Sequence, residues 1–241
     1  MTTVERYAIE NSVFLASRGI KLLVVACNTA SALALPRIRE MIGIDVVGVI
    51  GPGGRKAVEL TSHKTDPKVG VIATDATVES RAYLETVKRV SATTRVFQAG
   101  CPLFVPLAEE GWTSEPETFS IAAKYLKDMK IFAPDALVLG CTHYPILRDV
   151  IQQIMGKNVK LVDSGEATAE EVERLLIEKN LSNPEIHQGE RRLCDDLDHF
   201  FVTDAAERFA RVAERFLGAK LSKLEAIEVN AIDEVRRKHD R

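Results

Sequence analysis

The amino-acid sequence predicts an α/β protein built from parallel sheets. Short apolar runs alternate with stretches whose apolar residues recur at helical spacing. Such runs, bounded by turn-forming residues, are typical of strands buried on both faces of a parallel sheet. Two of them, residues 22–26 and 136–140, each end at a cysteine followed closely by a threonine. The alternation favours right-handed β-α-β crossovers, with both cysteines where ligands bind in open α/β sheets.

The first elements are a helix, a strand, a second helix and a second strand. Residues 2–18 place apolar side chains on one face of a 3.6-residue period. These side chains are Val4, Tyr7, Ala8, Phe14 and Leu15. The strand at 22–26 follows, and residues 30–42 form a helix in which Pro36 predicts a kink or a late start. Residues 45–50 are the second strand.

The sequence Gly-Pro-Gly-Gly at residues 51–54 is the strongest turn signal in the chain and predicts a turn or a hinge. A second series of elements begins after it. Strands are expected at 69–73, 96–100, 136–140 and 159–162, and helices at 55–62, 79–90, 117–129 and 145–155.

The end of the chain is again of β/α type. A helix is expected at 167–179 and a strand at 200–203. Asp204 with Glu207 makes a capping-box pattern for a last helix, and Gly218 fits its C-terminal end. The charged residues 234–241 are expected to fray.

Composition excludes several classes of protein. The chain is 46% apolar and 28% charged with a net charge of −3, which indicates a globular protein without attraction to nucleic acid or membranes. No apolar run approaches the ~20 residues of a membrane span, and the N-terminus lacks a signal-peptide pattern. The cysteines form no C-x-x-C pair, which speaks against a metal site and favours reduced thiols in the cytoplasm. They are Cys27, Cys101, Cys141 and Cys194.

Two strand-end thiols suit the inversion of a carbon acid. One thiol takes a proton from one face of the carbon, and the other returns a proton to the opposite face. The carbon must lie next to a carboxylate, for which Asn28, Thr29, Thr142 and adjacent backbone amides supply donors. No lysine stands in a recognisable Schiff-base context, so the expected proton abstraction needs no cofactor.

Five segments of the chain resemble those of glutamate racemases. The two most specific surround Cys27 and Cys141 and read VVACNTASA and LGCTHYPIL. The others read VIATDATVES, CPLFVPLAEEG and FFVTDAAERF. The resemblance covers nearly the whole chain. It implies cofactor-free interconversion of L- and D-glutamate for peptidoglycan synthesis, with glutamate as the small-molecule partner and a homodimer as the assembly.

The resemblance also implies a fold and a set of site residues. Two similar α/β domains, residues 1–52 plus 164–241 and residues 53–163, would each contribute one cysteine to the cleft between them. Cys27 and Cys141 would be the two bases, and His143 and Glu109 would assist proton transfer near Cys141. The expected substrate ligands are Asn28, Thr29, Thr74, Thr77 and Thr142.

The sequence departs from the racemase pattern before Cys27. Racemases open with a strand that ends in an Asp-Ser-Gly-rich motif, followed by a Gly-Asp-Thr-Ala segment, and neither precedes Cys27 here. The first domain is therefore expected to be truncated by about 50 residues, the size of one and a half β/α units. The Asp-Ser-Gly at residues 163–165 belongs to another strand. Ala76 stands where the family usually has glycine.

Several alternatives stay open from the residues. The chain could be a catalytically impaired or inactive racemase-like protein that acts through protein contacts, or an aspartate racemase or arylmalonate decarboxylase of the same superfamily. Thr74 and Thr77 could simply cap a helix, His143 could be a capping or core histidine, and Glu109 could lie at a solvated helix end. Cys101 and Cys194 are expected to be inert core residues.

Overall fold

The computed structural model describes residues 2–183 and 198–229. The chain divides into two compact units, Met1–Leu175 and Leu176–Arg241, and each is described by itself. Cys194 and residues 234–241 lie outside the described residues. The division into domains at residues 52 and 163 stays a prediction. Within the described residues, no helix is both long and apolar enough to cross a membrane.

The first unit begins with a two-stranded parallel sheet. Strands β1 (Leu22–Val25) and β2 (Asp45–Gly48) pair directly. Helices α2 (Asn28–Leu33) and α3 (Leu35–Met41) connect them, and the break between these helices confirms the kink predicted near Pro36. Helix α1 (Thr3–Ser17) packs against them through Ile9, while Val4 and Tyr7 of the predicted apolar face are exposed.

A four-stranded parallel sheet follows, in the order β4-β3-β5-β6, and confirms the predicted parallel architecture. Its strands are β3 (Lys68–Ala73), β4 (Arg95–Gly100), β5 (Ala136–Gly140) and β6 (Lys160–Asp163). Strand β5 lies in the interior of the sheet and is buried along its whole length. It therefore reads as a continuous apolar run, as strands covered on both faces do.

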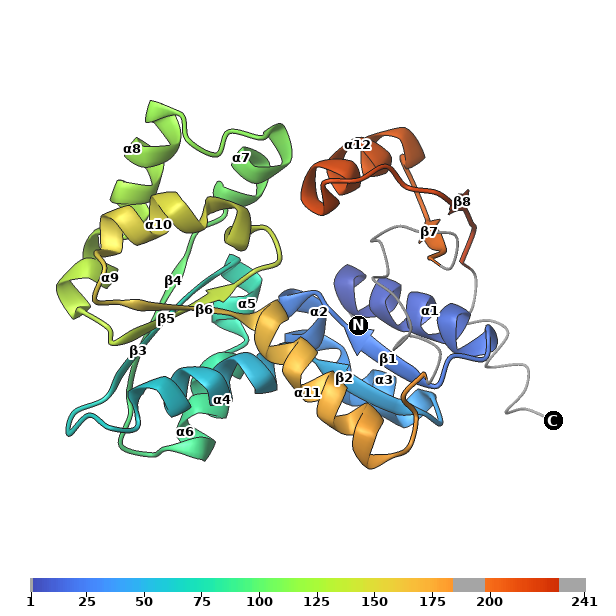
Figure 1. Ribbon diagram of the computed structural model, residues 1–241, viewed down its shortest axis with the longest axis horizontal. Coiled ribbons are helices and arrows are strands. Elements are labelled where there is room, and N and C mark those ends of the chain that lie inside the picture. The colour runs from blue at the N-terminus through green and yellow to red at the C-terminus, as the bar shows by residue number, and fades with distance from the viewer. Residues whose placement is uncertain (1, 184–197, 230–241) are drawn as a thin grey trace. The chain divides into compact units, whose positions relative to one another are not determined.

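Helices cover both faces of this sheet (Figure 1). Leu137 and Leu139 point into one core, whereas Ala136 and Val138 point into the other, as strand alternation requires. The first core is closed by α7 (Phe104–Glu110), α8 (Pro116–Tyr125), α9 (Lys127–Phe132), the 3₁₀ turn η1 (Tyr144–Leu147) and α10 (Arg148–Met155). The second core is closed by α4 (Ile50–Thr61) and α6 (Ala82–Val90).

The two sheets of this unit exchange helices. Helix α4 follows β2 in the chain but packs on β3 and β5 of the larger sheet. Helix α11 (Ser164–Glu178) follows β6, and its side chains line cavities together with residues of β1 and β2. Helix α4 thus joins the smaller sheet to the larger one, and α11 faces the smaller sheet across these cavities.

The Gly-Pro-Gly-Gly segment is helical, so the predicted turn or hinge is wrong. Residues 51–54 lie in the first half of α4. Pro52 is tolerated there because the amides of a first helical turn have no partner within the helix. Gly54 is required by packing, since a Cβ at this position would lie 2.7 Å from Cγ2 of Thr86 on α6. The glycines thus permit close helix contact.

In the described residues of the second unit, two short strands form a parallel pair. Strands β7 (Phe200–Val202) and β8 (Leu224–Ala226) are connected through α12 (Ala206–Leu217). The predicted capping box does not form, because the Asp204 carboxylate accepts from the Ala205 amide and α12 begins without a side-chain cap. Gly218 ends α12 with a positive φ of 67°, as predicted.

Replacement of Gly140 by alanine tests the packing at the end of β5. The added Cβ would lie 2.8 Å from the carbonyl oxygen of Ile72, a backbone atom of the neighbouring strand. We expect Gly140→Ala to lower the free energy of unfolding by about 1–3 kcal/mol, as overpacked cores do. Gly43→Ala is the matched control, since a Cβ there meets no atom within 4 Å. Equal urea midpoints for the two variants would contradict the described packing.

Candidate active site

The two cysteines occupy equivalent places at the ends of parallel strands. Cys27 follows β1 and is the N-cap of α2, with its Sγ 3.5 Å from the Ala30 amide that donates to it. Cys141 follows β5 and is buried. Both are free thiols, and Cys27 is exposed. Burial raises the pKa of Cys141 to about 11, and the negative charge of Cys27 acts in the same direction.

His143 lies next to Cys141, and Glu109 lies on the other side of the imidazole ring. The Nδ1 atom of His143 lies 3.7 Å from the sulfur of Cys141, and its Nε2 atom lies 3.3 Å from Oε1 of Glu109. Glu109 comes from the end of α7. A carboxylate accepts from Nε2–H, which leaves Nδ1 of a neutral ring as the proton acceptor that faces the thiol. This order of groups can carry a proton away from Cys141 and return it.

Three threonine hydroxyls form a closed triangle near Cys27. Oγ1 of Thr29 lies 2.9 Å from that of Thr74 and 3.0 Å from that of Thr77, and the last two are 3.0 Å apart. Thr74 also caps the short helix α5 (Asp75–Glu79), and its role in substrate binding stays a prediction. The triangle joins the segment after Cys27 to the end of β3. Its hydroxyl protons can be redirected towards an anion.

Asn28 is held inside the protein by partners from two other elements. Its side chain is 2% exposed. The Tyr83 hydroxyl on α6 lies 2.6 Å from Oδ1, and Nδ2 donates to Oγ of Ser164 at 3.5 Å. Ser164 in turn donates to the carbonyl of Leu139 in β5 at 3.3 Å. Asn28 therefore links the first cysteine segment to the strand that carries Cys141.

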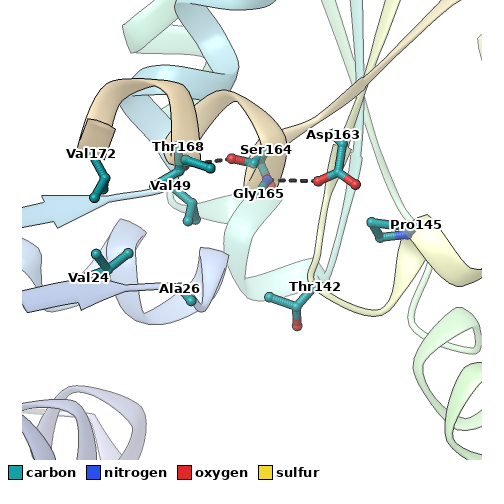
Figure 2. A pocket seen from close by; sticks show the side chains of 11 residues that line it. Val24, Ala26, Val49, Thr142, Pro145, Asp163, Ser164, Gly165, Thr168 and Val172 are labelled. Carbon is teal, nitrogen blue, oxygen red and sulfur yellow. Dashed lines mark hydrogen bonds between the residues drawn. The ribbon is translucent and has the colours of Figure 1, made fainter. Parts of the chain in front are cut away.

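A cavity of about 480 Å³ lies beside these groups, within the range of ligand pockets. Ala26 and Thr142, the direct neighbours of the two cysteines, both line it. Figure 2 shows Val24 and Ala26 on the β1 side and Thr168 and Val172 on α11 opposite them. The Thr168 hydroxyl donates to the carbonyl of Ser164, and the Gly165 amide donates to Asp163. The cavity thus joins an apolar part along β1 to a polar part at Thr142.

The structure gathers the residues expected from the sequence into two groups. The first contains Cys141, Thr142, His143 and Glu109, and the second contains Thr29, Thr74 and Thr77, with Cys27 and Asn28 next to Thr29. Their catalytic and binding roles stay predictions.

Sequence reasoning missed two residues of the site. Ser164 stands in the Asp-Ser-Gly sequence at the end of β6, which indicates the end of a strand but does not by itself indicate a site residue. No sequence pattern indicates Tyr83, because a buried aromatic residue on a helix is ordinarily part of the core.

Cys101 is wholly buried, as predicted for a core residue. Burial raises its pKa from the ordinary 9.0 to about 12, so the folded protein keeps this proton where the unfolded chain has lost it. The stabilisation is fully present below pH 9 and is lost as the pH rises towards 12. We expect the free energy of unfolding to fall over this range, and to fall less steeply in Cys101→Ala.

Urea unfolding across this pH range measures the effect. Cys27→Ala removes an exposed thiol and is the matched control, with the alkaline slope of the unchanged protein. Parallel pH profiles for Cys101→Ala and the unchanged protein would contradict the burial of a protonated thiol at this position.

The chain is similar to known proteins in sequence and in structure. The family model described as Asp/Glu/hydantoin racemase matches residues 5–172. The glutamate racemase of Geobacter metallireducens is 46% identical over 229 residues, which are 95% of this chain and 81% of the relative.

Two solved structures are similar in fold. The crystal structure of glutamate racemase from Francisella tularensis in complex with D-glutamate superposes with a TM-score of 0.83 at 32% identity, covering 95% of this chain and 81% of the other. A glutamate racemase isoform from Bacillus anthracis gives a TM-score of 0.82 at 31% identity, covering 94% and 80%.

Proposed function

The chain belongs to the Asp/Glu/hydantoin racemase family, and we propose that it interconverts L-glutamate and D-glutamate through two cysteine thiols. The observation that carries the mechanism is that Cys27 and Cys141 stand at equivalent strand ends and that their direct neighbours, Ala26 and Thr142, line the same cavity. Substrate identity is supported by the relatives, which are glutamate racemases at 46% and 40% identity.

The reaction needs one thiolate and one thiol in every turnover. The thiolate takes the α-proton, and the electron pair of the broken C–H bond delocalises into the α-carboxylate. The thiol on the opposite side then gives its proton to the same carbon, which inverts the configuration. Burial favours the thiol form of Cys141, so this residue is prepared to act as the proton donor while Cys27 acts as the base.

The reverse direction requires Cys141 to lose its proton. Nδ1 of His143 faces its sulfur, and Glu109 faces the other ring nitrogen. A proton accepted by His143 leaves an imidazolium next to Glu109, which stabilises that charge. This pair offsets the burial that otherwise holds Cys141 as a thiol.

The carboxylates of glutamate require donors, which the threonines supply. The triangle of Thr29, Thr74 and Thr77 provides three hydroxyl protons next to the first thiol, and Thr142 provides another next to the second. Each charge-assisted hydrogen bond to a carboxylate is stronger than a neutral one. Donors also lower the energy of the carbanion, whose charge spreads onto the α-carboxylate.

The family relationship supports further parts of the proposal. The two cysteine-bearing halves act as two similar α/β domains around one site, as the repeated strand-cysteine pattern indicates. The protein is a cytoplasmic homodimer that uses no cofactor, and its D-glutamate enters peptidoglycan synthesis. Light scattering tests the dimer, and a monodisperse monomer at micromolar concentration would count against it.

Removal of either thiol tests the two-base mechanism. We expect Cys27→Ala and Cys141→Ala each to abolish racemisation in both directions, because every turnover uses one acid and one base. Circular dichroism of L- and D-glutamate solutions measures the conversion. Cys101→Ala is the control and should keep its activity, since this thiol is enclosed in the core. Substantial turnover by either active-site variant would refute the mechanism.

Replacement of His143 by asparagine tests the proton path at Cys141. We expect kcat to fall by about 10²–10⁴-fold, the usual contribution of an assisting acid–base group. Glu109→Gln should give a smaller loss in the same direction, because it leaves the ring in place and removes only the charge opposite Nε2. Initial rates from each enantiomer measure both effects. An unchanged kcat in His143→Asn would show that this histidine is only structural.

A further inference from the structure

We propose that Tyr83 is a positioning residue of the active site, which fixes Cys27 through a one-way chain of hydrogen bonds across Asn28 and Ser164. The inference rests on the proposed function, because Cys27, the residue that Tyr83 positions, is one of the two proposed bases. The four groups of the chain come from four elements, namely α6, the start of α2, the start of α11 and β5.

The last acceptor fixes the direction of the whole chain. The carbonyl of Leu139 can only accept, so the single proton of the Ser164 hydroxyl points to it. The Ser164 oxygen is then left to accept, which requires an N–H of Asn28 on that side. The amide oxygen of Asn28 consequently faces Tyr83, which must donate. Burial raises the pKa of Tyr83 and keeps this hydroxyl protonated.

The surroundings pack closely around the Tyr83 ring and hydroxyl. A Cβ on Gly53 would come within 3.3 Å of the hydroxyl oxygen and 3.1 Å of Cβ of Ser164. A Cβ on Gly140 would come within 3.1 Å of the Tyr83 ring. Glycine at both positions therefore makes room for the ring and its hydroxyl. Tyr83 itself is 0% exposed, so water does not replace its bond to Asn28.

The chain acts on catalysis because Asn28 is the residue after Cys27. An amide held at both ends cannot rotate, so the backbone from Cys27 to Thr29 is fixed against the larger sheet. That backbone sets the position of the Cys27 sulfur against the Ala30 amide and of the Thr29 hydroxyl against its two threonine partners. Loss of the tyrosine hydroxyl should loosen this segment and leave the ring packing intact. A small misplacement of a reacting group costs much in rate.

The test combines Tyr83→Phe and Asn28→Ala in a double-mutant cycle. The readout is the rate at which iodoacetamide alkylates Cys27 in the folded protein, followed on its peptide by mass spectrometry. We expect Tyr83→Phe to slow alkylation about fivefold, the equivalent of one lost hydrogen bond, because the Ala30 amide is no longer held against the sulfur. In the Asn28→Ala background the same change should have less than a twofold effect.

Two outcomes would overturn the proposal. An unchanged or faster alkylation rate in Tyr83→Phe would show that the hydroxyl does not hold Cys27 in place. Equal effects of Tyr83→Phe with and without Asn28 would show that the hydroxyl acts through a partner other than Asn28. Tyr144→Phe is the matched control, because Tyr144 is equally buried and donates to a backbone carbonyl, that of Cys101, at 2.9 Å. Its Cys27 alkylation rate should equal that of the unchanged protein.

Glutamate kinetics separate this inference from the proposed function. In Tyr83→Phe we expect kcat to fall about 10-fold or more with KM within twofold, because positioning of a reacting group affects the chemical step. A rise in KM with an unchanged kcat would overturn the inference. If the unchanged protein fails to racemise glutamate, the proposed function is wrong, and the alkylation cycle still decides the role of Tyr83.

Discussion

The buried amide of Asn28 is the contact on which the arrangement of the two thiols depends. Burial of an amide without partners costs about 1–3 kcal/mol, so the fold must bring a donor and an acceptor to it. Tyr83 on α6 supplies the donor, and Ser164 at the start of α11 supplies the acceptor. Satisfying one amide therefore fixes the segment after β1 against the end of β5. The positions of Cys27 and Cys141 follow from the same contact.

The two thiols have different chemical environments, although the two enantiomers that they interconvert are mirror images. Cys27 is exposed, whereas Cys141 is buried with its pKa raised to about 11 and with His143 and Glu109 behind it. The enantiomers of glutamate have equal free energies in water, so the equilibrium constant is one and kcat/KM must be equal in the two directions. The asymmetry of the thiols can therefore make kcat differ between the two enantiomers only if KM differs by the same factor. His143 and Glu109 compensate for the burial that makes Cys141 a weak base.

Local patterns predicted those parts of the fold that depend on local physics. Apolar runs marked the buried strands, and the residues after them marked both thiols, since a parallel strand ends where its apolar run ends. The Gly-Pro-Gly-Gly segment misled because glycine signals a turn or a close contact equally well, and only the facing Thr86 decides between them. The capping box at Asp204 failed because the backbone at Ala205 is left-handed, which a three-residue pattern does not reveal.

The candidate site was predictable residue by residue but not as a connected whole. Cys27, Cys141 and the threonines stand in recognisable motifs, and His143 follows Cys141 closely in the chain. The triangle of Thr29, Thr74 and Thr77 and the link from Asn28 to Tyr83 join residues 45 to 55 positions apart, so they exist only after folding. No local pattern distinguishes Tyr83 from an ordinary core tyrosine. Such long-range polar contacts are where a structure adds most to the sequence.

The most direct test of the two-thiol account follows the α-proton of glutamate in heavy water. L-glutamate is incubated with the unchanged protein in D₂O, and circular dichroism measures inversion while NMR measures deuterium at the α-carbon. Because the proton given back comes from a second thiol that has exchanged with solvent, the account predicts that each molecule of D-glutamate formed carries a solvent deuterium. Inversion that retains the original α-proton would contradict it, and so would the absence of any inversion.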